Sequence, residues 1–497
     1  MSSEKSRVFV IFTSSGLDHR GAWEPAEMHQ HVLSNTMLLH EIEMQAPEIE
    51  FVGKTELLEE ERKARISLAH YHTTDEEKRY QAETQALIQR RRAQVVRQVQ
   101  DLRDELAGIL IFGAPWKELI QLGLPTVAVF TMWGTWMANF DFSAFAQERI
   151  LTSWLPVVRD ASKEVFAARI QDIARKLHLL HAIHRMKGLR ALVITDEPIL
   201  GAFEPGYGDK KEYERIFMEN LQETLGSELI TIPQEELYKR LPLVNQKEAQ
   251  KISQKWIRES AGMRDTNEEE VFKSAQLYLA MGELMEQYNC QAITTEGYGV
   301  FAQYPKGPIP SQGLPSSQFY TDGVIATSEC LINSLLTQQL GLYVTGRPSF
   351  NGDYLIDPFH DVAIVGHCEC PFNPYGDERR SPYIIRNLPR WKKYEGGACV
   401  QVELPLLETV TVTRLSMHDK KLCLFTGETI PGRALFAEWD DLACRTKLAI
   451  RTNTQALLRN LDWRTFGNHR VVFYGDYRQD MKDLAVLLGF GVVEEDL

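Results

Sequence analysis

The sequence has none of the short motifs that mark the common nucleotide-binding and hydrolase sites. No G-x-G-x-x-G follows the first apolar stretch, and neither G-x-x-x-x-G-K-[ST] nor G-x-S-x-G occurs. A dinucleotide fingerprint, a P-loop and a nucleophile elbow are therefore excluded as sources of activity. No repeat of 20 to 50 residues is present, which excludes solenoid folds.

Cysteine is scarce and long hydrophobic runs are missing. The seven cysteines all lie after residue 289, an odd and uneven set that suits a reducing compartment better than a disulfide framework. The first apolar stretch, residues 8–12, is too short for a signal peptide. Since nowhere do about 18 apolar residues follow one another, we expect a cytoplasmic protein without a membrane span.

Positive charge is also in deficit. The 55 Lys and Arg are outnumbered by 68 Asp and Glu, which gives a net charge of −13. A polyanion would be repelled by this field, so we expect no nucleic-acid partner.

The first part of the chain alternates short apolar stretches with helical patterns. Apolar runs occur at residues 8–12, 49–52, 107–112 and 126–130, and a long Glu-, Gln- and Arg-rich helical pattern covers residues 75–106. Alternation of this kind predicts βαβ units around a parallel sheet. We therefore expect an α/β fold with a Rossmann-like N-terminal domain over residues 1–185.

The rest of the chain divides into two further predicted domains. Residues 186–345 repeat the α/β alternation and contain a loop, residues 305–317, that is rich in Pro, Gly and Ser. After residue 398 the pattern changes to β-type runs at 398–404, 409–415 and 422–425. We expect a Rossmann-like middle domain, then a C-terminal domain (346–497) with an antiparallel β-barrel.

One histidine-containing motif has several interpretations. His367-Cys368-Glu369-Cys370 directly follows an apolar strand, where α/β proteins place ligands. It is compatible with a zinc site, with buried inert thiols, or with a functional His367.

Two carboxylates and a second histidine form a more informative set. Glu329 begins an apolar helix and could simply complement its dipole, and Asp353 could be a turn residue after Asn351-Gly352. Together with His469 near the C-terminus, however, they can assemble a divalent site suited to Mn²⁺ or Mg²⁺.

The residues from 322 to 368 carry a family resemblance. Glu329 and Asp353 are separated by 353 − 329 = 24 positions, and a strand ending in Gly366-His367 follows. This arrangement, with Gly467-Asn468-His469 near the end of the chain, resembles the L-fucose isomerase and L-arabinose isomerase superfamily. The resemblance covers residues 290–497 in order and spacing.

The resemblance implies a metal-dependent aldose–ketose isomerase acting on an open-chain monosaccharide through a cis-enediolate. Glu329 and Asp353 would be the catalytic carboxylates and, with His469, the ligands of Mn²⁺ or Mg²⁺. Arg20 and His367 would contact the substrate, Arg20 across a subunit boundary. The active form would then be a homo-oligomer, a trimer or hexamer.

Two other functions fit the same residues. A sugar-binding protein could keep the fold without turnover, and a metal-dependent epimerase or aldolase could use the same enediolate. Product analysis distinguishes the enzymes from one another.

Overall fold

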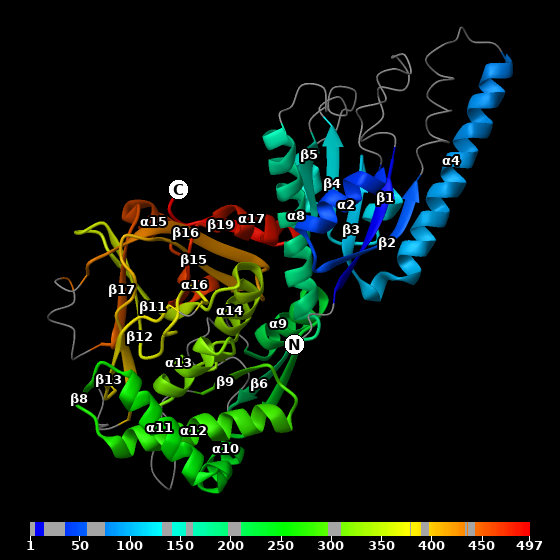
Figure 1. Ribbon diagram of the computed structural model, residues 1–497. Coiled ribbons are helices and arrows are strands. Elements are labelled where there is room, and N and C mark those ends of the chain that lie inside the picture. Colours follow the sequence, from blue (N-terminus) through cyan, green and yellow to red (C-terminus); the bar gives the residue numbers. More distant parts are fainter. Residues whose placement is uncertain are drawn as a thin grey trace. The chain divides into compact units, whose positions relative to one another are not determined.

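The computed structural model describes residues 5–13, 35–56, 75–131, 142–155, 163–196, 210–296, 310–377, 379–388, 397–432, 435 and 443–497. The chain forms two compact units: residues 1–184 with 482–490, and residues 185–481 with 491–497 (Figure 1). The three-domain division at residues 185 and 345 stays a prediction. No described helix combines the length and the apolar character that a bilayer crossing requires.

The first unit is built on a five-stranded sheet in the order β2-β1-β3-β4-β5, with every neighbouring pair parallel. Its strands are β1 (Ser6–Phe12), β2 (Ile49–Glu56), β3 (Leu106–Phe112), β4 (Thr126–Thr131) and β5 (Ile150–Leu155). The helices between and after them are α2 (Asn35–Gln45), α4 (Asp75–Asp101), α5 (Lys117–Ile120), α7 (Phe142–Gln147) and α8 (Lys163–Met186). The central strand β3 is buried along its whole length, as parallel strands usually are.

The second unit contains a four-stranded parallel sheet in the order β10-β9-β6-β7. Its strands are β6 (Arg190–Ile194), β7 (Glu228–Ile232), β9 (Ala292–Thr295) and β10 (Ile325–Thr327). Its helices are α9 (Lys210–Thr224), α10 (Gln234–Arg240), α11 (Gln246–Glu259), α12 (Glu268–Gln287), α13 (Gly313–Thr321) and α14 (Ile332–Thr345). The predicted α/β class with parallel sheets is confirmed, whereas the Rossmann-like description stays a prediction.

A closed six-stranded antiparallel barrel completes the second unit, as expected. The order is β15-β18-β11-β12-β17-β16, and β15 pairs with both β18 and β16, which closes the sheet. The strands are β11 (Phe350–Asp357), β12 (Val362–His367), β15 (Thr409–Ser416), β16 (Lys421–Ile430), β17 (Thr446–Arg451) and β18 (His469–Tyr474); β19 (Gly491–Glu494) adds to β16 in parallel. The remaining helices of this unit are α15 (Thr454–Asn460) and α16 (Trp463–Phe466), whereas most of α17 (Arg478–Leu488) belongs to the first unit.

Two segments differ from the sequence-based expectation. The β-type run at 398–404 contributes β14 (Cys399–Val402) to a separate sheet with β13 (Tyr383–Arg386) and β8 (Met263–Arg264), not to the barrel. Part of the predicted loop 305–317 is helical, because α13 begins at Gly313. Pro315 is compatible with a first helical turn, where its missing N–H has no intrahelical partner to lose.

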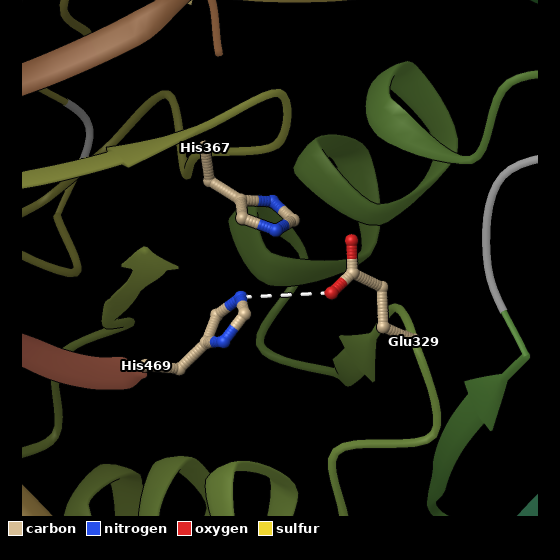
Figure 2. Close-up of side chains that lie close together, drawn as sticks. All are labelled: Glu329, His367 and His469. Atoms are coloured by element: carbon tan, nitrogen blue, oxygen red, sulfur yellow. Dashed lines mark ion pairs between the residues drawn. The ribbon is translucent and has the colours of Figure 1, made fainter. Parts of the chain in front are cut away.

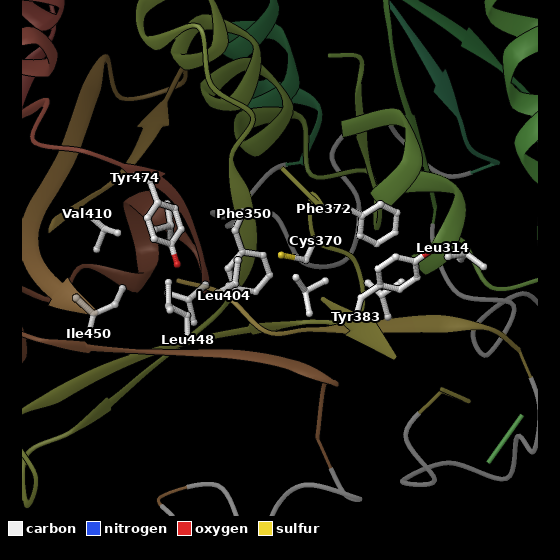
Figure 3. Close-up of a cluster of buried hydrophobic side chains, with 14 of the residues drawn as sticks. Leu314, Phe350, Cys370, Phe372, Tyr383, Leu404, Val410, Leu448, Ile450 and Tyr474 are labelled. Carbon is white, nitrogen blue, oxygen red and sulfur yellow. The ribbon is translucent and has the colours of Figure 1, made fainter. Parts of the chain in front are cut away.

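The barrel shares one apolar core with the elements around it. Phe350 of β11, Leu448 of β17 and Tyr474 of β18 belong to the same buried cluster as Leu314 of α13 and Tyr383 of β13 (Figure 3). Burial of such apolar surface stabilises the unit at about 25 cal/mol per Å². The barrel is thereby fixed to the helices that precede it.

Helix α14 links the parallel sheet to the barrel. It contacts β9 and β10 of the sheet as well as β15 and β18 of the barrel. Gly341 allows the close approach, because a Cβ there would clash with the ring of Phe473 on β18. The segment that precedes α14 is therefore held beside the start of β18.

Candidate metal centre

Glu329 lies between the end of β10 and the start of α14, with an unusual backbone. Glu329 and Cys330 both adopt the left-handed region, at φ 64° and φ 50°. The Cys330 N–H donates to the carbonyl of Thr295 at 2.8 Å, which holds the turn against the end of β9. Left-handed non-glycine residues cost about 1–3 kcal/mol each and concentrate at functional sites. The turn points the Glu329 carboxylate toward the barrel.

Two barrel histidines meet this carboxylate. His367 is the last residue of β12 and His469 the first of β18, and their ring centroids lie 5.4 Å apart. One ligand atom each from Glu329, His367 and His469 lies within 4.8 Å of the others (Figure 2). Within the described part of the chain, this is the group of His, Cys, Asp or Glu side chains spaced to hold a metal ion.

The spacing suits a shared ion better than direct hydrogen bonds. His469 Nε2 lies 3.7 Å from Glu329 Oε2 and 3.7 Å from Asp353 Oδ1. These separations exceed the roughly 3.2 Å limit of a hydrogen bond. Two ligand atoms that each lie about 2.0–2.4 Å from one ion can be at most about 4.0–4.8 Å apart, so atoms separated by 3.7 Å can bind the same ion. His469 Nε2 is buried and has no hydrogen-bond partner among the described residues. The residues present therefore fit a divalent ion.

Asn468 fixes the orientation of His469 and Asp353 together. Asp353 and His469 are directly paired residues of β11 and β18. The Asn468 amide oxygen lies 2.8 Å from His469 Nδ1, and its amide nitrogen donates to Asp353 Oδ1 at 3.0 Å. If Nδ1 carries the proton, Nε2 has its lone pair free for a metal, which is the usual arrangement for a ligating histidine.

The charged side chains around Glu329 and His367 shift one another's pKa values. Burial, reinforced by Asp353 and Glu369, raises the pKa of Glu329 to about 8. The surrounding protein also raises the pKa of Asp353, although 43% of that side chain remains accessible. Burial disfavours protonated His367, yet Glu369 and Glu329 outweigh it and raise the pKa of His367. Burial lowers the pKa of His469 well below its usual value, so its imidazole is neutral near pH 7.

A third carboxylate stands behind His367. Glu369 is fully buried, and its Oε1 accepts the Tyr320 hydroxyl at 3.0 Å and the Ser328 N–H at 3.3 Å. The same oxygen lies 3.8 Å from His367 Nδ1. A carboxylate behind a ligating histidine sets its orientation and raises its basicity. We therefore assign Glu369 as a positioning residue for His367.

Replacing this carboxylate tests its role. Glu369→Gln keeps an acceptor for Tyr320 but removes the negative charge beside His367, so the pKa of His367 should fall. Affinity for Mn²⁺ should weaken by roughly 10- to 100-fold, the typical effect of losing an outer-shell partner. NMR titration of His367 and calorimetry of Mn²⁺ binding measure these effects, and Tyr320→Phe serves as the control that keeps the charge. An unchanged His367 pKa with unchanged affinity would contradict the assignment.

The predicted site residues are placed as follows. Glu329 and His469 come together as expected. His367, which was expected to contact substrate, lies with Glu329 and His469 in the group that could hold a metal ion. Asp353, which was expected to be a ligand, lies outside this group, 3.7 Å from His469 Nε2. Arg20 lies outside the described residues.

Two residues were not predicted to act in the site. Asn468 could have been suspected because it precedes His469, and Glu369 because it lies two positions after His367. The sequence does not show that Glu369 faces the histidine, because both side chains leave the strand end where regular alternation stops.

Comparisons with known proteins do not identify a family: no protein-family model matches the chain, and no curated protein matches it significantly.

Proposed function

We propose that this protein is a metal-dependent aldose–ketose isomerase that acts on an open-chain monosaccharide, similar to L-fucose and L-arabinose isomerases. The observation that carries the proposal is the pair of carboxylates around one neutral histidine nitrogen. Glu329 and Asp353 both lie 3.7 Å from His469 Nε2, and both have raised pKa values. Carboxylates whose pKa values are raised by their surroundings are typical of functional sites.

The carboxylates suit a proton transfer between C1 and C2 of the sugar. One ionised carboxylate accepts the proton from the carbon next to the carbonyl, which gives a cis-enediolate, and then returns it to the neighbouring carbon. A base with a pKa near the working pH can both accept and release this proton. Glu329, whose pKa is about 8 in the metal-free protein, would act as this base, and Asp353 would move the hydroxyl proton.

The histidines and Glu329 would hold the cation. His367, His469 and Glu329 supply nitrogen and oxygen donors, and Asp353 is close enough to add a fourth. This mixed donor set suits Mn²⁺, or Mg²⁺ if more oxygen is supplied by substrate and water. When bound, the cation would polarise the carbonyl and stabilise negative charge on the substrate oxygens.

The competing functions make different demands on these residues. A sugar-binding protein has no need of two carboxylates with raised pKa values, so these values favour an enzyme. An epimerase or aldolase would use the same enediolate and differs only in the product.

Product formation in D₂O tests the proposal. The Mn²⁺-loaded protein would be incubated with pentoses, 6-deoxyhexoses and 6-anionic hexoses, and the products followed by NMR. We expect one sugar class to be isomerised, with deuterium at C2 of the aldose or C1 of the ketose, because a carboxylate-held proton exchanges with water.

Other outcomes would contradict specific parts of the proposal. Isomerisation with fully protonated product would indicate a hydride shift and remove Glu329 and Asp353 from proton transfer. Cleavage or epimerisation would indicate the related enzymes. Saturable binding without conversion of any sugar would favour the sugar-binding protein.

A further inference from the structure

Three of the seven cysteines gather beside the candidate metal centre. Cys368 follows β12, Cys399 begins β14, and Cys444 precedes β17. Cys368 and Cys399 are buried in one small cluster, and Cys444 packs against it with partial exposure. Segments separated by 31 and 76 positions from Cys368 thus bring thiols to one point.

The Cys444 thiol also reaches the candidate metal centre. Its Sγ lies 3.6 Å from Asp353 Oδ2, to which it donates a weak hydrogen bond. Asp353 is also held by Asn468 on its other oxygen. Oxidation of the Cys444 thiol would therefore remove one of the two hydrogen bonds that position the Asp353 carboxylate.

Cys444 is better placed than Cys399 to form a bond with Cys368. Cys399 is paired with Arg386 across the sheet, and its thiol donates to the Asn387 carbonyl at 3.2 Å. It is also packed against Gly313, where a Cβ would lie only 2.7 Å from Cys399 Cβ. Cys444 is partly exposed and lies before β17 begins, so its backbone is not tied by strand pairing of its own.

The ends of β12 and β17 bring Cys368 and Cys444 close together. His367, the residue before Cys368, pairs with Thr446, two residues after Cys444. A Cβ on Gly366 would lie 3.9 Å from the Cys444 Cβ, so Cys444 packs against the end of β12. A disulfide needs Cβ atoms about 3.5–4.5 Å apart, so the link requires the segment before β17 to shift toward Cys368.

We propose that Cys368 and Cys444 form a reversible intramolecular disulfide when the protein meets a peroxide. In the first step the Sγ of one of these two cysteines attacks one peroxide oxygen, the O–O bond breaks, and water leaves, which yields a sulfenic acid. In the second step the Sγ of the other cysteine attacks that sulfur, and the hydroxyl leaves as water with the proton of the attacking thiol. One peroxide is reduced to two waters while two thiols are oxidised to one disulfide. The link removes the Cys444 S–H that donates to Asp353.

Peptide mapping of the full-length protein tests the proposal without any sugar substrate, so it is independent of the proposed function. After treatment with hydrogen peroxide, free thiols would be alkylated and the protein digested without reductant. Mass spectrometry should detect a peptide pair joined through Cys368 and Cys444, two hydrogens lighter than the reduced pair. Dithiothreitol should abolish it.

Cysteine variants test which two thiols form the disulfide. Cys444→Ser should abolish the joined peptide, whereas Cys290→Ser, which removes a thiol far away in sequence, should leave it unchanged. A Cys368–Cys399 link in the unaltered protein, a link between two copies, or a Cys444 oxidised to sulfinic acid without any link would overturn the proposal. Mapping of the unaltered protein decides these outcomes even if a variant does not fold.

Discussion

Replacing Glu329 with glutamine is expected to lower sugar turnover by at least about 10²-fold, the usual size of a general-base contribution. The substitution keeps the shape of the side chain but removes the charge that accepts the proton. It should also remove the group whose pKa burial raises to about 8. Initial rates, measured by NMR on the sugar identified in the screen, provide the test.

Asp353→Asn should produce a loss of similar size, because its carboxylate stands beside the same histidine nitrogen. Both variants would be assayed at saturating Mn²⁺, so that weaker metal binding does not imitate slower proton transfer. Glu235→Gln is a matched control, since its carboxylate is exposed on α10 and pairs with Lys239. Near-normal turnover in Glu329→Gln or Asp353→Asn would leave that residue without a role in proton transfer.

Affinity for Mn²⁺ is expected to rise steeply with pH. In the metal-free protein Glu329 has a pKa of about 8, so below that pH the proton must leave before the carboxylate can bind an ion. Well below this pKa, one released proton changes the binding constant about tenfold per pH unit, and between pH 6 and pH 8 the ionised fraction of Glu329 rises roughly 50-fold. The raised pKa of His367 adds to this slope, whereas His469, with its lowered pKa, stays neutral.

Calorimetric titrations in buffers of different ionisation heat would give both the affinity and the protons released. Glu329→Gln should flatten the pH dependence and lower the number of protons released. An affinity that does not change between these pH values would contradict the assignment of Glu329 as a buried ligand.

The same shifts determine how pH affects folding stability. Glu329 and His367 have folded-state pKa values above their ordinary ones, so the folded protein holds more protons than the unfolded chain. From about pH 6.5 to 8 the metal-free protein should therefore lose stability as pH rises. Below that range the lowered pKa of His469 acts in the opposite direction. Thermal unfolding with and without Mn²⁺ measures this effect.

The local structure of this protein could be predicted from residue patterns. Predicted strands at residues 8–12, 107–112 and 126–130 correspond to β1, β3 and β4, and the long helical pattern from residue 75 corresponds to α4. These elements were predictable because their apolar periodicity depends only on neighbouring residues. Glu329 was likewise predicted from its immediate context to begin an apolar helix, and it lies three residues before α14.

Which side chains come together could not be predicted from these patterns. Glu329, His367 and His469 come from three distant segments, and their proximity depends on how α14 packs between the parallel sheet and the barrel. The position of β14 in a separate sheet is likewise a property of the whole fold. The same holds for the packing of Cys444 against the cluster that contains Cys368. Contacts of this kind depend on long-range strand register and close packing, which local residue patterns do not encode.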